Sequence, residues 1–202
     1  MSRSSSPALV IAGLSMAFIV IFSNWLMQGG FELPDGSTLP QEFGWLNDFF
    51  GLEGDNRVFI YGQFTFPIAF LITDIINRVF GPQRAGYIIA VGVIFGGLAS
   101  YYFATPQIAL ASVTAFVVGQ VLDVALFQRL RQMTWYIAPL VSSILASLFD
   151  TVIFYAIAFG LMNSLGYASV DMGVKVFVAL IALLPFRLII ASLIGNPAAR
   201  EG

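Results

Sequence analysis

Long apolar runs alternate along this chain with short polar or turn-forming breaks. A membrane-spanning helix needs about 20 predominantly apolar residues. Six runs meet this length, over residues 7–28, 58–80, 85–104, 107–127, 136–162 and 173–194. The breaks are rich in Gly, Pro, Asn and Arg, which is typical of turns between helices. The pattern therefore predicts an all-α membrane protein in which residues 1–202 form one bundle of six transmembrane helices.

The composition supports this class. Of the 202 residues, 58% are hydrophobic and only 10% are charged, and the mean hydropathy is +0.88. Soluble domains carry about 25% charged residues. The charged residues of this chain are too few to cover a water-facing surface. The lipid bilayer is therefore the expected environment.

The positions of the basic residues predict the orientation. With six spans, one side of the membrane receives Arg3, Arg78, Arg84, Arg129, Arg131 and Arg200, and the other only Arg57 and Lys175. Arg and Lys concentrate in cytoplasmic loops. Both termini are therefore expected in the cytoplasm, and the long acidic loop over residues 29–57 outside.

Aromatic residues inside that loop recur at helical spacing. Phe43 and Leu46 are three apart, and Trp45 and Phe49 are four apart. Trp and other aromatic residues favour the headgroup level of the bilayer. We expect a short interfacial helix here, acting as a plain anchor or as a lid over an outward-facing cavity.

Missing residue types exclude several functions. The chain has no Cys and no His, which removes disulfides, thiolate metal sites and the commonest neutral-pH general base. No basic stripe with interleaved aromatic residues is present, so no nucleic-acid partner is expected. We predict no metal, no cofactor and no enzymatic activity. An aspartyl-type intramembrane enzyme would need a GxGD-like element, and the sequence has none.

Three acidic residues inside apolar runs are the most informative polar positions. They are Asp74, Asp123 and Asp150. A carboxylate in hydrocarbon is costly, so such residues usually face the bundle interior and mark a functional site. The alternative is that they form isolated ion pairs or fix helix ends, which suits Asp74 and Asp123 better than the deeper Asp150.

Each of these acids has a polar neighbour on the same helical face. Asn77 follows Asp74 by three residues, Gln120 precedes Asp123 by three, and Ser143 precedes Asp150 by seven. Residues three and four apart are neighbours on a helix surface. We predict that Asp74, Asn77, Gln120 and Asp123 form one substrate site towards the cytoplasmic half. Ser143 could equally serve helix packing.

Other polar and aromatic residues complete the predicted site. Arg187 lies deep in the last span, where it is expected to pair with an aspartate such as Asp150, to bind a ligand or to snorkel. Lys175 is expected in the first turn of that span, reaching the outer interface. Asn24 could be a polar contact or an interface anchor, and Phe66 offers a stacking face.

The chemistry of these groups predicts a small planar heterocyclic substrate. A carboxylate accepts the paired N–H groups of a guanine-type edge, and amides both donate and accept. Aromatic walls from 20 Phe and seven Tyr suit a flat ring. A lipid or an anion would fit such a site poorly.

Several segments resemble a known family of membrane transporters. They are FTFPIAFLITDIINRVFGPQRA at 64–85, FSNW at 22–25, ASVTAFVVGQVLDVALFQRLR at 111–131, SSILASLFDTVIFYAIAF at 142–159, and KV followed by LPFR at 175–187. In this order they resemble the VUT (vitamin uptake transporter) family, the queuosine-precursor transporters of bacterial inner membranes. Arg78, where an acid is commoner, and Ser143, in place of an amide, depart from that pattern.

The resemblance implies a multi-pass inner-membrane protein that imports 7-cyano-7-deazaguanine, 7-aminomethyl-7-deazaguanine or both. A substrate-binding subunit similar to the S components of energy-coupling-factor transporters is the alternative. Ala8 and Ala12 form an A-x-x-x-A pair like that of S components, although such a pair is frequent in membrane helices. A homodimer is compatible with either interpretation.

Overall fold

The computed structural model describes residues 5–28, 60–160, 162 and 164–194. Every element in these ranges is an α-helix, so the predicted all-α class is confirmed. The helices are α1 (Ser5–Leu26), α3 (Tyr61–Thr65), α4 (Pro67–Phe80), α5 (Pro82–Phe103), α6 (Pro106–Leu130), α7 (Ile137–Ala158) and α8 (Leu165–Ile194). The predicted interfacial helix and acidic loop lie outside the described residues.

Five of these helices are long and apolar enough to cross a membrane, namely α1, α5, α6, α7 and α8. The chain is therefore a multi-pass membrane protein. The predicted span over 58–80 instead consists of two shorter helices, α3 with five residues and α4 with 14. At ~1.5 Å per residue α4 is about 21 Å long, which is short of the roughly 30 Å of hydrocarbon.

Pro67 explains the interruption between α3 and α4. Proline has no N–H and cannot donate to the carbonyl four residues earlier. Phe66 sits at the junction with helical dihedral angles, and its N–H donates to Gly62 O at 3.0 Å. The predicted span is thus interrupted at Pro67. Pro139, by contrast, lies in the first turn of α7, where no intrahelical bond is lost.

The start of α8 differs from the prediction. The helix begins at Leu165, eight residues before the predicted boundary of 173. Asp171 and Gly173 interrupt the apolar run, and hydropathy alone therefore placed the boundary too late. As a consequence Lys175 lies in the third turn of the helix, inside the bundle, rather than at its outer edge.

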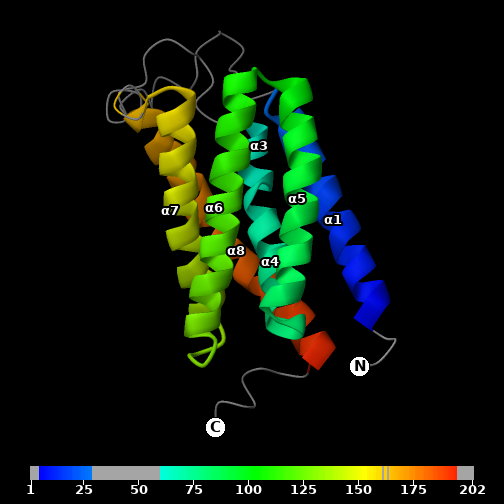
Figure 1. Cartoon of the computed structure of the whole chain (residues 1–202). Helices are drawn as coiled ribbons and strands as arrows, with labels where there is room; N and C mark the ends of the chain where they lie inside the picture. The colour runs from blue at the N-terminus through cyan, green and yellow to red at the C-terminus, as the bar shows by residue number, and fades with distance from the viewer. Residues whose placement is uncertain (1–4, 29–59, 161, 163, 195–202) are drawn as a thin grey trace, which may run out of the picture.

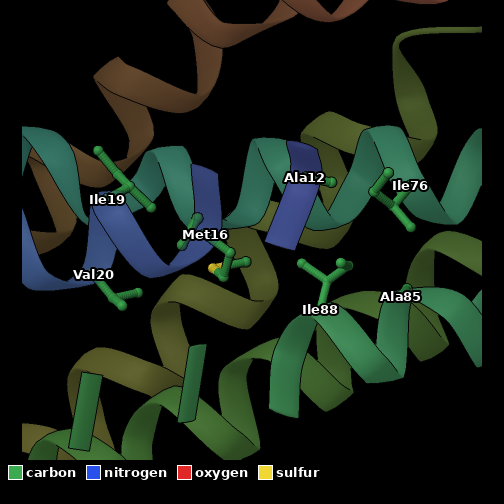
Figure 2. Close-up of a cluster of buried hydrophobic side chains, with 8 residues drawn as sticks. Ala12, Met16, Ile19, Val20, Ile76, Ala85 and Ile88 are labelled. Carbon is green, nitrogen blue, oxygen red and sulfur yellow. The ribbon is translucent and has the colours of Figure 1, made fainter. Parts of the chain in front are cut away.

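α4 is the central helix and packs against each of the other helices that the structure describes (Figure 1). On one side α4 joins α1 and α5 in an apolar cluster of fully or almost fully buried side chains (Figure 2). The labelled members are Ala12, Met16, Ile19, Val20, Ile76, Ala85 and Ile88. This cluster holds α4 in place, so that its opposite face is presented to α6, α7 and α8.

The beginning of α1 and the end of α8 lie at the same end of the bundle (Figure 1). Arg78, Arg84, Arg129 and Arg131 lie at or next to helix termini there, and we call it the arginine end. Two of these arginines tie α4 to α6. Arg78 donates to the carbonyl of Arg131 at 2.8 Å, and Arg131 donates to the carbonyl of Arg78 at 2.9 Å.

Candidate functional site

A large cavity occupies the half of the bundle opposite the arginine end. Its volume is about 570 Å³, within the range of roughly 300–1,000 Å³ that is usual for small-molecule sites. Its rim includes residues at the ends of α1, α5 and α7, such as Gln28, Ala104 and Phe159. We call it the outer cavity.

Aromatic side chains form much of the wall of the outer cavity. Phe66 and Phe70 come from the α3–α4 region, and Phe154 and Tyr155 from α7. The rings of Phe154 and Tyr155 meet edge to face, with centroids 5.2 Å apart. Such walls offer flat faces on which a planar ring could stack.

The floor of the outer cavity is an ion-paired cluster. Lys175 Nζ lies 2.6 Å from Asp150 Oδ2 and 2.7 Å from Asp171 Oδ2. Nζ also donates to Thr151 Oγ1 at 2.8 Å, and that hydroxyl donates to Asp171 Oδ2 at 3.0 Å. Lys175 is only 7% exposed. We call Asp150, Thr151, Asp171 and Lys175 the lysine cluster.

Helical geometry explains how the lysine cluster forms. Asp171 and Lys175 are four residues apart on α8 and therefore share a face. Asp150 and Thr151 are consecutive on α7, which packs against α8. A buried lysine is tolerated because two carboxylates compensate its charge and the Thr151 hydroxyl accepts a hydrogen bond from the ammonium.

Three of the predicted site residues line the outer cavity, namely Asn24, Phe66 and Asp150. Asn24 donates through Nδ2 to the carbonyl of Val20 at 2.8 Å, which fixes its amide. The side chain of Asp150 is 16% exposed, against 8% for Asp171. Asp150 is therefore the carboxylate of the lysine cluster that a ligand reaches most easily.

Two other predicted residues, Asp74 and Asp123, meet in the interior. Asp74 is 2% exposed and Asp123 is 0% exposed, and the two carboxyl groups interact with each other. Ser143 donates to Asp74 Oδ2 at 3.3 Å. Asp74 Oδ1 and both Asp123 oxygens have no hydrogen-bond partner among the described residues. We call Asp74 and Asp123 the carboxyl pair.

Asn77 and Gln120 flank this region without lining the outer cavity. Both are fully buried. Asn77 accepts a hydrogen bond from Gln128 and donates to the carbonyl of Val124 at 3.4 Å. Neither polar atom of the Gln120 side chain has a partner among the described residues. The polar faces of α4 and α6 thus do face each other, as their spacing predicted.

The expectation that Arg187 pairs with Asp150 is wrong. The guanidinium of Arg187 lies over the ring of Trp135, 5.0 Å from its centroid, and Asp150 binds Lys175 instead. The expectation that Lys175 reaches the outer interface is also wrong. Both errors follow from the misplaced start of α8, which put Lys175 two turns too close to the helix end.

Sequence reasoning missed Asp171, Lys175, Gln63 and Tyr155 as residues of the cavity. A usable signal existed for the first two, since Asp171 and Lys175 are an i, i+4 acid–base pair. No comparable signal marks Gln63 and Tyr155, which meet only because α3 packs near α7 and α8. No group of three or more potential metal ligands occurs among the described residues.

A family model described as "Putative vitamin uptake transporter" matches residues 96–190, from α5 to α8. The chain is 36% identical over 163 residues to the "Probable queuosine precursor transporter" of Haemophilus influenzae, with 70% of this chain and 66% of that protein covered. It is 33% identical over 153 residues to the "Queuosine precursor transporter" of Escherichia coli, with 62% and 69% covered. The chain belongs to the vitamin uptake transporter family. The predicted resemblance is therefore confirmed.

The chain spans about two thirds of the length of these two relatives. Both relatives are named as transporters, which agrees with the prediction that this family member is no enzyme. No solved structure matches the chain.

Proposed function

We propose that the chain imports queuosine precursors across a bacterial inner membrane. The substrates are 7-cyano-7-deazaguanine, 7-aminomethyl-7-deazaguanine or both. The observation that carries the proposal is the outer cavity, which has aromatic walls and a carboxylate floor, in a chain whose relatives are named for this activity. A guanine-type base is flat and carries adjacent N–H donors, so its shape and its donors both suit that cavity.

Asp150 is the proposed anchor for the base. Lys175 donates to Oδ2, which leaves Oδ1 as an acceptor on the carboxylate that is more exposed to the cavity. A carboxylate that accepts charge-assisted hydrogen bonds forms roughly twice as strong a contact as a neutral acceptor. Asn24 and Gln63 would bind the remaining polar edge, and Phe66 and Phe154 would stack on the ring.

The other predicted residues lie on the way from this cavity to the arginine end. Asp74 and Ser143 line a smaller cavity beneath the lysine cluster, and Asn77, Gln120 and Asp123 are buried around them. We propose that the substrate moves inward past Ser143, Asn77 and Gln120, beside the carboxyl pair, which does not itself bind the substrate. Arg187, beside Trp135, would meet the substrate last, near the inner face.

We further propose six membrane crossings with both termini in the cytoplasm. In this topology α3 and α4 together make the second crossing, and the arginine end is cytoplasmic, as the preference of arginine for cytoplasmic loops favours. The outer cavity then faces the periplasm. Its location on that side is what a first binding site for an imported substrate requires.

A substrate-binding subunit of an energy-coupling-factor transporter is less well supported. Ala12 of the A-x-x-x-A pair is buried against Met16, Ile76 and Ile88 inside the bundle. It is therefore not available to dock a separate module. The relatives are also named as transporters rather than as subunits of a larger complex.

Uptake in cells tests the proposed function. The chain is expressed in a bacterium that neither makes nor imports these precursors, and the accumulation of radiolabelled 7-cyano-7-deazaguanine and of radiolabelled 7-aminomethyl-7-deazaguanine is measured. We expect uptake well above that of cells with the empty vector. A chain that reaches the membrane but takes up neither base would refute the proposal.

A further inference from the structure

The carboxyl pair has no basic partner among the described residues. Asp74 and Asp123 lie side by side in the interior of the bundle, and three of their four oxygens have no partner among the described residues. Ser142 interacts with Asp123 and is itself 0% exposed, but its hydroxyl makes no hydrogen bond of ordinary geometry to any described residue. Two carboxylates that are this close and this deeply buried cannot both stay ionised without a bound cation, so otherwise one of them must be protonated.

None of the surrounding helices supplies a positive charge to this pair among the described residues. α1 and α3 have no charged residue. The titratable groups of α4, α5 and α6 other than the pair are Arg78, Arg84, Tyr87, Tyr101, Tyr102 and Arg129, and those of α7 and α8 are Asp150, Tyr155, Tyr167, Asp171, Lys175 and Arg187. Only the two aspartates and the serines of α7 act electrostatically on the pair.

A small cavity is lined by one member of the carboxyl pair, Asp74, and by one member of the lysine cluster, Lys175. It has a volume of about 20 Å³ and is lined by Asp74, Ser143, Ser147 and Lys175 among others. One water molecule needs on the order of 10–15 Å³, so a single water would fit. Lys175 and Phe70 line both this cavity and the outer cavity. These two side chains therefore lie between the outer cavity and the small cavity that Asp74 lines.

We propose that the carboxyl pair binds one proton, shared between Asp74 and Asp123, and that this proton is transported together with the substrate. This deepens the proposed function and rests on it. The proton comes from periplasmic water, passes the outer cavity and the small cavity, and converts one carboxylate of the pair to a carboxylic acid. It is released to the cytoplasm after the substrate, which regenerates the carboxylate.

Proteoliposomes that contain the purified full chain separate transport from coupling. Counterflow of radiolabelled 7-cyano-7-deazaguanine, measured without any ion gradient, reports substrate exchange alone. Accumulation is then measured with an inward proton gradient, with an inward Na⁺ gradient, and with neither, while a trapped pH dye records proton entry. We expect the proton gradient alone to raise accumulation several-fold, and substrate to accelerate acidification of the lumen.

Variants of the pair locate the coupling site. Asp74→Asn and Asp123→Asn imitate the protonated state in shape and charge, so both should retain counterflow and lose accumulation driven by the proton gradient. Glu201→Gln removes a carboxylate close to the end of the sequence and should change neither. Size-exclusion profiles and melting temperatures in detergent show whether each variant is folded.

These experiments distinguish a failure of proton coupling from a failure of the proposed substrate transport. Absence of counterflow by the wild-type chain would refute the transport of this base. If the wild-type chain shows counterflow but its accumulation does not respond to the proton gradient, or responds to the Na⁺ gradient, proton coupling is refuted. The proposed transport of the base would then still stand. Folded aspartate variants that lose counterflow would make the pair a substrate ligand, and folded variants that keep proton-driven accumulation would exclude it as the proton site.

Discussion

Lys175 Nζ lies 2.6 Å from Asp150 Oδ2, and this contact joins α8 to α7 at the floor of the outer cavity. Both side chains are largely buried. Removing one partner of a buried ion pair usually costs 3–5 kcal/mol, because the other charge is left uncompensated. The contact therefore stabilises the packing of α7 on α8 at this site, and replacing either residue alone is expected to be destabilising.

Replacing Lys175 by methionine should destabilise the protein strongly. Lys175→Met strands two carboxylates, and we expect the free energy of unfolding to fall by about 3–5 kcal/mol. Thermal unfolding in detergent measures this. Arg187→Met is the matched control. Among the described residues the Arg187 guanidinium stacks on Trp135 and forms no ion pair, so this substitution should cost about 1 kcal/mol or less. Equal melting temperatures for the two variants would contradict this description of the lysine cluster.

Truncating Phe154 should weaken substrate binding much more than stability. Stacking of a base on an aromatic side chain contributes about 1–3 kcal/mol, so Phe154→Ala should raise the Kd for 7-cyano-7-deazaguanine roughly 5- to 150-fold. Calorimetry with the purified chain measures the Kd. Phe149→Ala, on the same helix but 51% exposed, should leave the Kd unchanged. Similar losses in both variants would argue against stacking at Phe154.

Two glycines should respond oppositely to alanine. A Cβ at Gly62 would lie 2.8 Å from the carbonyl oxygen of Ser23 and would also meet Met27, whereas a Cβ at Gly86 meets nothing within 4 Å. Gly62→Ala should push α3 away from α1 and lower both the melting temperature and uptake. Gly86→Ala should raise stability by about 0.5–1 kcal/mol, since alanine favours helix. A neutral Gly62→Ala would show that α3 is not packed as described.

Single-cysteine labelling tests the proposed topology, and the native chain has no cysteine to interfere. Gln83→Cys and Gln132→Cys lie at the arginine end and should react with a membrane-impermeant maleimide only after the cells are opened. Met162→Cys, at a position that is 80% exposed, should react in intact cells. Labelling of Gln83→Cys in intact cells would rule out a cytoplasmic arginine end.

The helical membrane fold could be predicted from the sequence, because apolar runs of membrane length are explicit in it. The break at Pro67 was equally predictable, since it follows from the missing N–H. The start of α8 was not predictable in the same way, because Asp171 lowers the local hydropathy. The pairing of Asp171 with Lys175 offsets the cost of burying this residue, but a hydropathy average does not include that pairing. Hydropathy treats each charge as exposed, whereas a buried acid–base pair compensates its own cost.

The candidate site was predictable in its parts but not in its grouping. Periodicity indicated that Asp74 and Asp123 each face the bundle interior, and in the structure they meet. It could not show that Asp150 belongs to a different centre, with Lys175, because that depends on how α7 and α8 are rotated against each other. The contacts of Gln63 and Tyr155 likewise depend on the tertiary packing of α3.

The central claim is that the substrate binds in the outer cavity. It is tested most directly by measuring whether the substrate protects a cysteine in that cavity from a thiol reagent. Ser112 lines that cavity and is partly exposed, so Ser112→Cys should react with a small thiol reagent added from outside. The account predicts that 7-cyano-7-deazaguanine slows this reaction over the same concentration range in which it saturates uptake, and that it leaves the labelling of Met162→Cys unchanged. An unchanged rate at Ser112→Cys under saturating substrate, in a variant that still transports, would contradict the assignment of the outer cavity as the substrate site.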